Sequence, residues 1–187
     1  MRFKMIASAL AFALLAVNVA KADSPDEQKA KIRQATQQTL QDLYKLQPSA
    51  QGAIQKAAGY AVFKNFGTNL LVVSTASGKG IATNNQTKQE TFMKMISGGA
   101  GLGVGVKDFR VIFVFETDKA FNQFLSSGWS GSGQADAAAK AGKSGSAVSG
   151  AVEVAPDTYV YQITKNGLAL QLTLQGTKYY KDDDLNK

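Results

Sequence analysis

The chain has 187 residues and a formal net charge of +7, from 21 Lys and Arg against 14 Asp and Glu. It contains no His and no Cys, which excludes Ser-His-Asp and Cys-His catalysis, disulfide bonds and the common zinc sites. The basic balance favours an anionic partner such as a lipid headgroup.

Residues 1–22 have the pattern of a secretory signal peptide. Arg2 and Lys4 precede the apolar run Met5 to Val19, and Ala20-Lys21-Ala22 forms an A-x-A cleavage site. We therefore expect one domain over residues 23–187, exported to the periplasm and peripheral on a membrane. Cleavage would remove three basic residues and no acidic ones, leaving a net charge of +4. Nucleic acid is not an expected partner of an exported protein with scattered lysines.

Two helices are expected at the start of the domain. Ser24 to Glu27 predicts a capping box, with Pro25 in the first turn. Apolar residues then recur at helical spacing from Ile32 to Leu46, and Pro48 ends the pattern. A second, short helix is predicted from Ser49 to Ala57. The first helix is amphipathic, which is compatible with a membrane surface but more typical of packing on the protein's own core.

From Tyr60 onward the sequence pattern predicts short β-strands. Tyr60–Phe63 and Asn69–Thr75 are predicted strands, and Ser77–Gly80 is predicted to be a tight turn into the strand Ile81–Thr83. Thr91–Ile96 is the next predicted strand.

Ser97 to Glu116 is the most distinctive stretch. Glycine occupies every second position from Gly99 to Gly105, so an extended chain would have one face without side chains. Such a face suits close approach of backbone or helix, or contact with a ligand. The apolar run Val111–Phe115 predicts a buried strand.

The last third mixes helix, strand and small residues. Thr117 predicts the cap of a helix that Gly128 ends. Val148–Val154 is a candidate strand after a segment rich in Ser, Gly and Ala. Asn166-Gly167 predicts a hairpin with a type I′ turn between Thr158–Thr164 and Leu168–Leu174. Asp182 to Asp184 lacks the spacing of a calcium loop and predicts a solvated tail.

These elements predict an α+β fold. Two N-terminal helices and one internal helix would pack on a bent antiparallel β-sheet or partly closed barrel. No paired carboxylates, metal ligands or phosphate loop emerge from the sequence, so we expect no enzyme activity, no metal and no cofactor.

Seven residues are candidates for lipid contact. The basic ones lie at expected strand ends or in glycine-rich loops, positions that can converge on one rim of the sheet. Trp129 stands among Ser and Gly, and a tryptophan beside a basic rim suits the headgroup depth of a membrane. The alternative is solvated lysines and a tryptophan that closes the core. The candidates are Lys64, Lys79, Lys107, Arg110, Trp129, Lys140 and Lys143.

Several segments in order are similar to the SYLF lipid-binding domain family, also called the yeast-type actin-binding domain family, as an exported bacterial member. The matching segments are Ala58–Phe63, Ser77–Ile81, Gly99–Glu116, Ala135–Ala137 and the closing hairpin from Tyr159 to Lys178. Lys64, where the family usually has proline, and Gln175, where it usually has glutamate, depart from the pattern.

The resemblance implies binding and not catalysis. Eukaryotic members of the family bind phosphoinositides and other anionic phospholipids, and some bind actin. For this chain the resemblance implies binding of anionic phospholipid at a membrane surface of the cell envelope, whereas actin is not an expected partner of an exported protein. The alternative is a structural or protein-interaction module of the periplasm or cell envelope.

Overall fold

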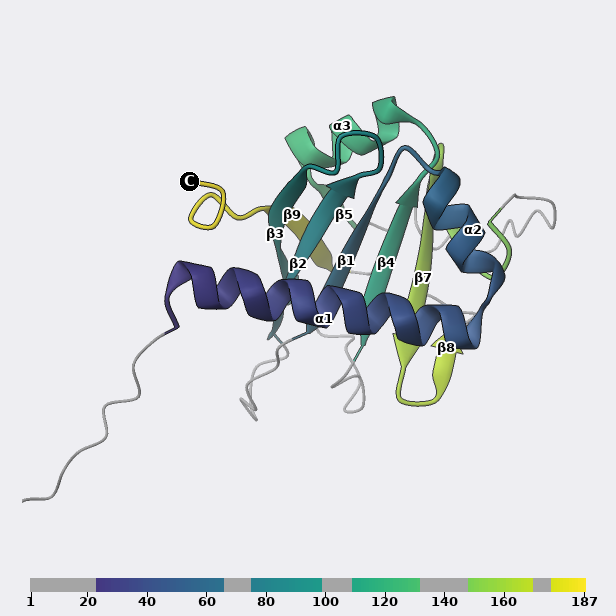
Figure 1. The fold of residues 1–187 in the computed structure, drawn as a ribbon, viewed down its shortest axis with the longest axis horizontal. Helices are drawn as coiled ribbons and strands as arrows, with labels where there is room; N and C mark the ends of the chain where they lie inside the picture. The colour runs from purple at the N-terminus through teal and green to yellow at the C-terminus, as the bar shows by residue number, and fades with distance from the viewer. Residues whose placement is uncertain (1–22, 66–74, 99–108, 132–147, 170–175) are drawn as a thin grey trace, which may run out of the picture.

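The computed structural model describes residues 23–65, 75–98, 109–131, 148–169 and 176–187 (Figure 1). The helices in these ranges are α1 (Pro25–Leu46), α2 (Ser49–Lys56) and α3 (Asp118–Ser127). The strands are β1 (Gly59–Asn65), β2 (Thr75–Asn84), β3 (Glu90–Gly98), β4 (Arg110–Phe115), β5 (Trp129–Ser130), β6 (Val152–Ala155), β7 (Thr158–Thr164), β8 (Gly167–Ala169) and β9 (Thr177–Lys181).

The described strands form one antiparallel sheet in the order β5-β9-β3-β2-β1-β4-β7-β6, and β8 also pairs with β7. The sheet curls into a half-barrel. Figure 1 shows α1 crossing the strands on one side, while β9 and β5 pass behind. The α+β fold with a strongly bent sheet, predicted from the sequence, is confirmed.

The first helix begins where its capping residues predict. The Glu27 backbone N–H donates to the Ser24 hydroxyl, and the Glu27 carboxylate accepts from the Ser24 backbone N–H at 2.7 Å. These two bonds satisfy donors that a helix start would otherwise leave unpaired. They also lower the pKa of the Glu27 carboxyl, the backbone bond from Ser24 being the larger cause. At its other end the helix stops at Leu46, two residues before Pro48.

The predicted internal helix is confirmed as α3. The Thr117 hydroxyl accepts from the Ala120 N–H, and Gly128 ends the helix with a positive φ of 68°. Phe121 and Phe124 on its buried side point into the sheet. The helix thereby covers the face opposite α1.

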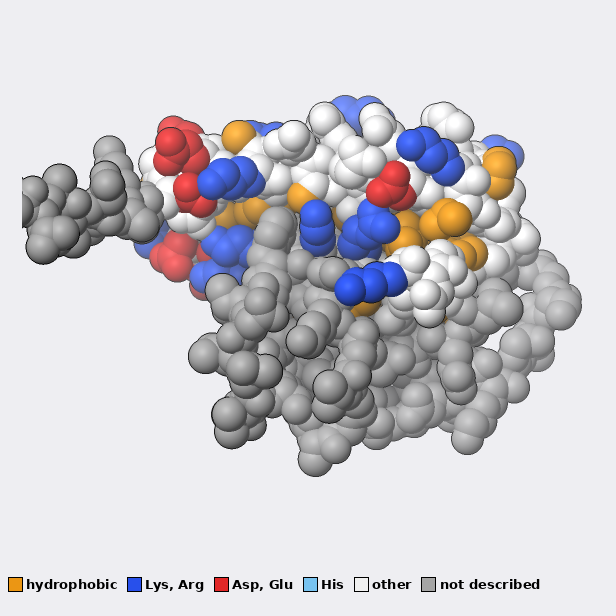
Figure 2. Space-filling model, turned by 90° about the horizontal axis from the view of Figure 1, so that it is seen from below, with side chains coloured by type: hydrophobic (Ala, Val, Ile, Leu, Met, Phe, Trp, Pro, Cys, Tyr) orange, Lys and Arg blue, Asp and Glu red, His pale blue; other side chains and the backbone are white. Residues whose placement is uncertain are grey.

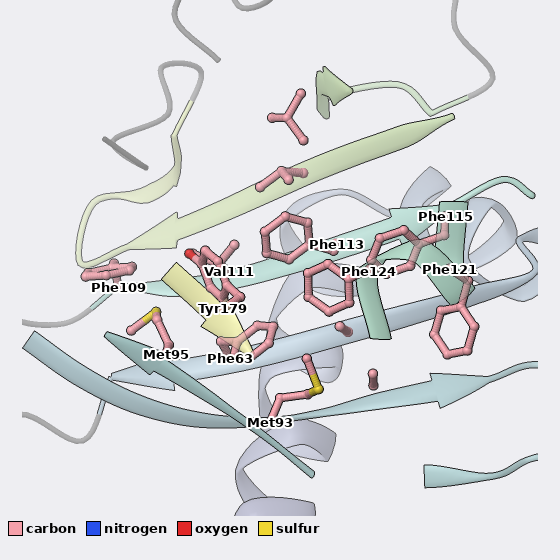
Figure 3. Packing of buried hydrophobic residues seen from close by; sticks show 14 residues of the cluster. Phe63, Met93, Met95, Phe109, Val111, Phe113, Phe115, Phe121, Phe124 and Tyr179 are labelled. Atoms are coloured by element: carbon pink, nitrogen blue, oxygen red, sulfur yellow. The ribbon is translucent and has the colours of Figure 1, made fainter. Parts of the chain in front are cut away.

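An aromatic core fills the α3 side of the sheet (Figure 3). The Phe113 ring centroid lies 6.0 Å from that of Phe63, 5.1 Å from that of Phe124 and 4.9 Å from that of Tyr179. Inclined aromatic pairs stabilise a core by about 0.5–1.5 kcal/mol each beyond the area that they bury. The Tyr179 hydroxyl is buried without a hydrogen-bond partner among the described residues, and burial raises its pKa.

The opposite face packs against α1 and α2. Leu43 and Ile54 from the helices meet Val62, Ile112 and other apolar side chains of the central strands. A smaller cluster joins the N-terminal half of α1 to the edge of the sheet, and its members are Ile32, Ile81, Phe92 and Leu185. The amphipathic stripe of α1 is therefore covered by its own sheet, as the commoner interpretation of the sequence predicted.

The predicted tight turn at Ser77–Gly80 is wrong, because these residues lie inside the continuous strand β2. A Cβ added to Gly80 would collide with the carbonyl oxygen of Val62 and lie 2.6 Å from the Phe63 ring. A Cβ on Gly78 would lie 2.7 Å from the carbonyl oxygen of Lys64. The two glycines permit close approach within the sheet and do not turn the chain.

The final hairpin forms, but its turn differs from the type I′ prediction. Thr164 pairs with Gly167, so Lys165 and Asn166 make the loop. Gly167 alone of the four has a positive φ, at 105°. A type I′ turn needs the left-handed region at both central residues, so this two-residue loop is not of that type. The candidate strand Val148–Val154 is shorter and later than predicted, since β6 covers Val152–Ala155.

The C-terminal residues are not the solvated tail that their charge predicts. Asp182 is fully buried, and its carboxylate lies 2.9 Å from the ammonium of Lys94. The Asn186 side chain accepts from the Phe92 N–H at 2.9 Å and donates to the Phe92 carbonyl at 2.8 Å. It therefore pairs with β3 as a neighbouring strand would, which holds Leu185 in the apolar cluster.

Candidate functional site

Four cationic side chains form a row across four adjacent strands. Lys94 in β3 pairs with Lys79 in β2, Lys79 pairs with Lys64 in β1, and Lys64 pairs with Arg110 in β4. Partners directly opposite each other in a sheet point to the same face. We call Lys94, Lys79, Lys64 and Arg110 the basic row.

The basic row lies on the α1 face, at the end of the strands where β1 and β4 meet the residues that the structure does not describe. Two residues away along each strand, the same face is apolar and packs beneath α1, through Phe92, Ile81, Val62 and Ile112. Figure 2 shows Lys and Arg side chains gathered along the strip beside α1, with acidic and apolar side chains between them. The helix thus borders the row on one side.

Carboxylates balance the two ends of the row. Arg110 donates to Asp42 of α1 at 2.5 Å, and this bond is the main reason that the pKa of the Asp42 carboxyl is lowered. At the other end Lys94 contacts Asp182 at 2.9 Å and Asp184 at 3.3 Å. The hydrogen bond to Asp182 is the main cause that raises the pKa of Lys94.

The two central residues of the row differ in exposure, and Lys64 is solvent-exposed. Lys79 is half-buried, and its ammonium donates to the neutral side-chain oxygen of Gln28 at 2.5 Å. Because Gln28 carries no charge, this contact orients the lysine and leaves its charge uncompensated. Lys79 therefore contributes a positive charge to the row that its Gln28 partner does not offset.

A groove of about 500 Å³ opens beside the row, between the first turns of α1 and strands β2, β3 and β9. Its cationic lining comes from Lys31, Lys79 and Lys94, and Asp23 is its acidic lining residue. Apolar side chains of Ile32, Ile96 and Tyr180 line it as well. The groove combines positive charge with apolar surface in a volume typical of ligand pockets, roughly 300–1,000 Å³.

The structure brings together three of the predicted site residues: Lys64, Lys79 and Arg110. Lys107, Lys140 and Lys143 lie outside the described residues. Lys94 and Lys31 were missed by sequence reasoning. The alternation of Phe92, Lys94 and Ile96 could have placed Lys94 on one strand face, but the strand that it pairs with is a tertiary property.

Trp129 lies on the other face of the sheet from the basic row. Its ring is half-buried, with its centroid 5.5 Å from that of Phe113 and 5.9 Å from that of Tyr179. It packs against the aromatic core. This arrangement agrees with the interpretation that the tryptophan closes the core.

The described part of the chain supports neither a metal site nor a membrane-spanning helix. It holds no cluster of three or more acidic, His or Cys side chains suited to a metal ion. Its helices are also too short or too polar to cross a membrane. The chemistry that the arrangement offers is the binding of an anion beside an apolar surface.

Comparison with known proteins agrees with the sequence resemblance. A family model described as "Las17-binding protein actin regulator" (Ysc84) matches residues 96–187. The chain is also 33% identical over 145 residues to "Beta cell expansion factor A" from Aeromonas veronii, an alignment that covers 78% of this chain and 54% of that protein. The chain thus spans about half the length of the curated relative that it matches. The two matches together show that the chain belongs to the Ysc84, or SYLF, family.

Proposed function

We propose that the protein binds anionic phospholipid at a membrane surface of the cell envelope, without catalysis, through the basic row. The observation that carries this proposal is the row itself: three consecutive like-charge pairs in register across four strands. The family supports the coarser statement of a lipid- or actin-binding module. The signal-peptide pattern of residues 1–22 supports the periplasmic side of a membrane as the location.

The basic row lowers the stability of the fold, and this cost suggests that the row serves a function such as binding. Like charges directly opposite each other in a sheet destabilise it, by a few tenths to about 1 kcal/mol a pair. Positions where a sequence breaks a local rule in this way are often functional. An anionic surface laid against the row would relieve the repulsion between its members.

The expected strength of binding follows from the charge. Each lysine near an anionic membrane contributes about 1 kcal/mol, so four cations contribute about 4 kcal/mol, which corresponds to a dissociation constant near 1 mM. The carboxylates at the ends of the row reduce this further. Useful affinity therefore requires an apolar contribution in addition to the charges.

Vesicle co-sedimentation of the mature chain tests the proposal. Vesicles of phosphatidylglycerol and phosphatidylcholine should bind the protein, pure phosphatidylcholine vesicles should not, and added salt should weaken the binding. Replacing two lysines of the row, Lys64→Gln with Lys79→Gln, should weaken binding by about 30-fold. The variant should keep or slightly raise its Tm, because all three like-charge pairs of the row include Lys64 or Lys79 and are relieved.

The matched control removes two exposed lysines elsewhere, Lys56→Gln in α2 with Lys119→Gln in α3, which should leave binding within a few-fold of wild type. If both double variants lose binding equally, net charge and not the row attracts the membrane. Equal sedimentation with neutral and anionic vesicles would contradict the proposal outright.

A protein ligand is the second candidate, because the description of the matching family names a protein partner. Absence of vesicle binding by the wild-type chain, with intact folding, would favour it. The basic row would then be expected to face an acidic protein surface.

A further inference from the structure

We propose that the groove between α1 and strands β2, β3 and β9 holds one molecule of an anionic lipid, with its phosphate at the cationic lining and part of its acyl chain on the apolar lining. The inference rests on the proposed function, since it takes the ligand to be anionic lipid. It goes further by assigning a site for a single lipid molecule, distinct from attraction of a whole surface to the basic row.

The groove has exposed apolar side chains in its lining. The described residues expose three large hydrophobic side chains, and two of them, Ile96 at 48% and Tyr180 at 37%, line this groove. They come from neighbouring strands on the same face, because Lys94 pairs with Tyr180 and Ile96 pairs with Lys178. Ile32 of α1 lines the groove too, so the helix and the sheet both contribute apolar surface to it.

The groove is also lined by more positive than negative side chains. Three ammonium groups, of Lys31, Lys79 and Lys94, line the groove with one carboxylate, that of Asp23. Asp23 is engaged by Lys31 at 2.7 Å. An ammonium has three N–H donors, and Lys79 commits one to Gln28 in the part of the chain that the structure describes. A phosphate beside Lys79 and Lys94 would find donors without displacing their present contacts.

Both features point to an amphiphile. A free inorganic anion would leave Ile96 and Tyr180 exposed, and an uncharged apolar ligand would make no use of the ammonium donors of Lys79 and Lys94. A lipid phosphate with an attached chain satisfies both linings at once. It would also supply the apolar contribution that the basic row lacks.

Methyl NMR of the mature chain, labelled at isoleucine, tests the site directly. The probe is dihexanoyl phosphatidylglycerol below its micelle concentration, which presents single lipid molecules without a membrane. It should shift the methyl signals of Ile32 and Ile96 saturably, whereas glycerol phosphate, the headgroup alone, should bind at least about ten-fold more weakly because it buries no apolar surface. Dihexanoyl phosphatidylcholine should also bind more weakly, because it carries no net negative charge.

Two variants with equal loss of exposed apolar surface separate the groove from general hydrophobicity. Ile96→Ser should weaken binding of the short-chain lipid by about ten-fold. Leu46→Ser is the control, since Leu46 is 45% exposed at the far end of α1 and outside the groove, and it should leave binding unchanged. Circular dichroism of both variants checks that they are folded.

The outcomes divide clearly. The groove is not an amphiphile site if glycerol phosphate binds as tightly as the short-chain lipid, or if the two lipids bind equally. It is also not one if both variants lose binding equally, or if the shifts spare Ile32 and Ile96. If the groove fails while anionic vesicles still sediment the protein selectively, the proposed function stands without it. If sedimentation does not distinguish anionic from neutral vesicles, the proposed function fails whatever the NMR result.

Discussion

The face of the sheet that packs against α3 is lined by aromatic and aliphatic side chains, whereas the face beneath α1 changes from apolar to cationic within two residues along each strand. The first face carries much of the burial that stabilises the fold, including most of the buried rings. The second face bears three like-charge pairs that oppose folding. The comparison shows that the sheet can keep the destabilising basic row on one face because burial on the other face stabilises the fold.

The largest expected effect is on the aromatic face, at Gly80. Replacing Gly80→Ala should destabilise the protein by about 3 kcal/mol, because the added methyl group would collide with the carbonyl oxygen of Val62 and the Phe63 ring. Urea unfolding measures the change. Gly52→Ala is the matched control: a Cβ there meets nothing within 4 Å, so alanine in helix α2 should stabilise by about 0.5–1 kcal/mol. If Gly80→Ala is as stable as wild type, Gly80 does not pack closely against β1, and the tight turn that the sequence predicted would again be the better interpretation.

A smaller effect is expected at the border of the aromatic core. Trp129→Ala should cost about 2 kcal/mol, less than a fully buried ring, because Trp129 is half-buried against Phe113 and Tyr179. Trp129→Phe should recover most of the loss, and vesicle binding of the folded variants should be unchanged. A variant with normal Tm and weakened vesicle binding would instead make Trp129 a membrane contact, and the two faces would share the function.

The smallest effect concerns the α1 face and depends on pH. Folding lowers the pKa of Asp42 below its ordinary value of 3.8, chiefly because Arg110 donates a hydrogen bond to it. The stability that this contributes is present above pH 3.8 and is lost as the pH falls through the folded pKa. Asp42→Asn should therefore be less stable than wild type by about 0.5–1 kcal/mol at neutral pH, and the difference should shrink in acid.

The same variant sharpens the comparison of the faces, since it removes a negative charge next to the basic row. Anionic vesicles should bind Asp42→Asn more tightly than wild type, although its stability is lower. Unfolding curves from neutral to acidic pH and sedimentation at neutral pH provide both measurements. A parallel loss of stability and binding would indicate that Arg110 serves only the fold.

Local signals predicted the elements that depend on neighbours in sequence. The capping box at Ser24, the cap at Thr117 and the apolar run Val111–Phe115 were all read correctly, since each rests on contacts within a few residues. Ser77–Gly80 was misread because glycine signals both a turn and close packing, and only the neighbouring strand distinguishes them. Asp182 was misread for a similar reason, because its partner Lys94 lies far away in sequence.

The sequence by itself determined the fold class, the helix boundaries and the family. Periodicity, helix caps and motif order can each be recognised from residues that are close together in the sequence. Only the tertiary structure decided that Lys64, Lys79, Lys94 and Arg110 stand in one row and that Trp129 stands on the opposite face. The physical reason is strand register: a shift of one residue moves every side chain of a strand to the other face, and register is set by long-range pairing. The candidate site is a product of that register.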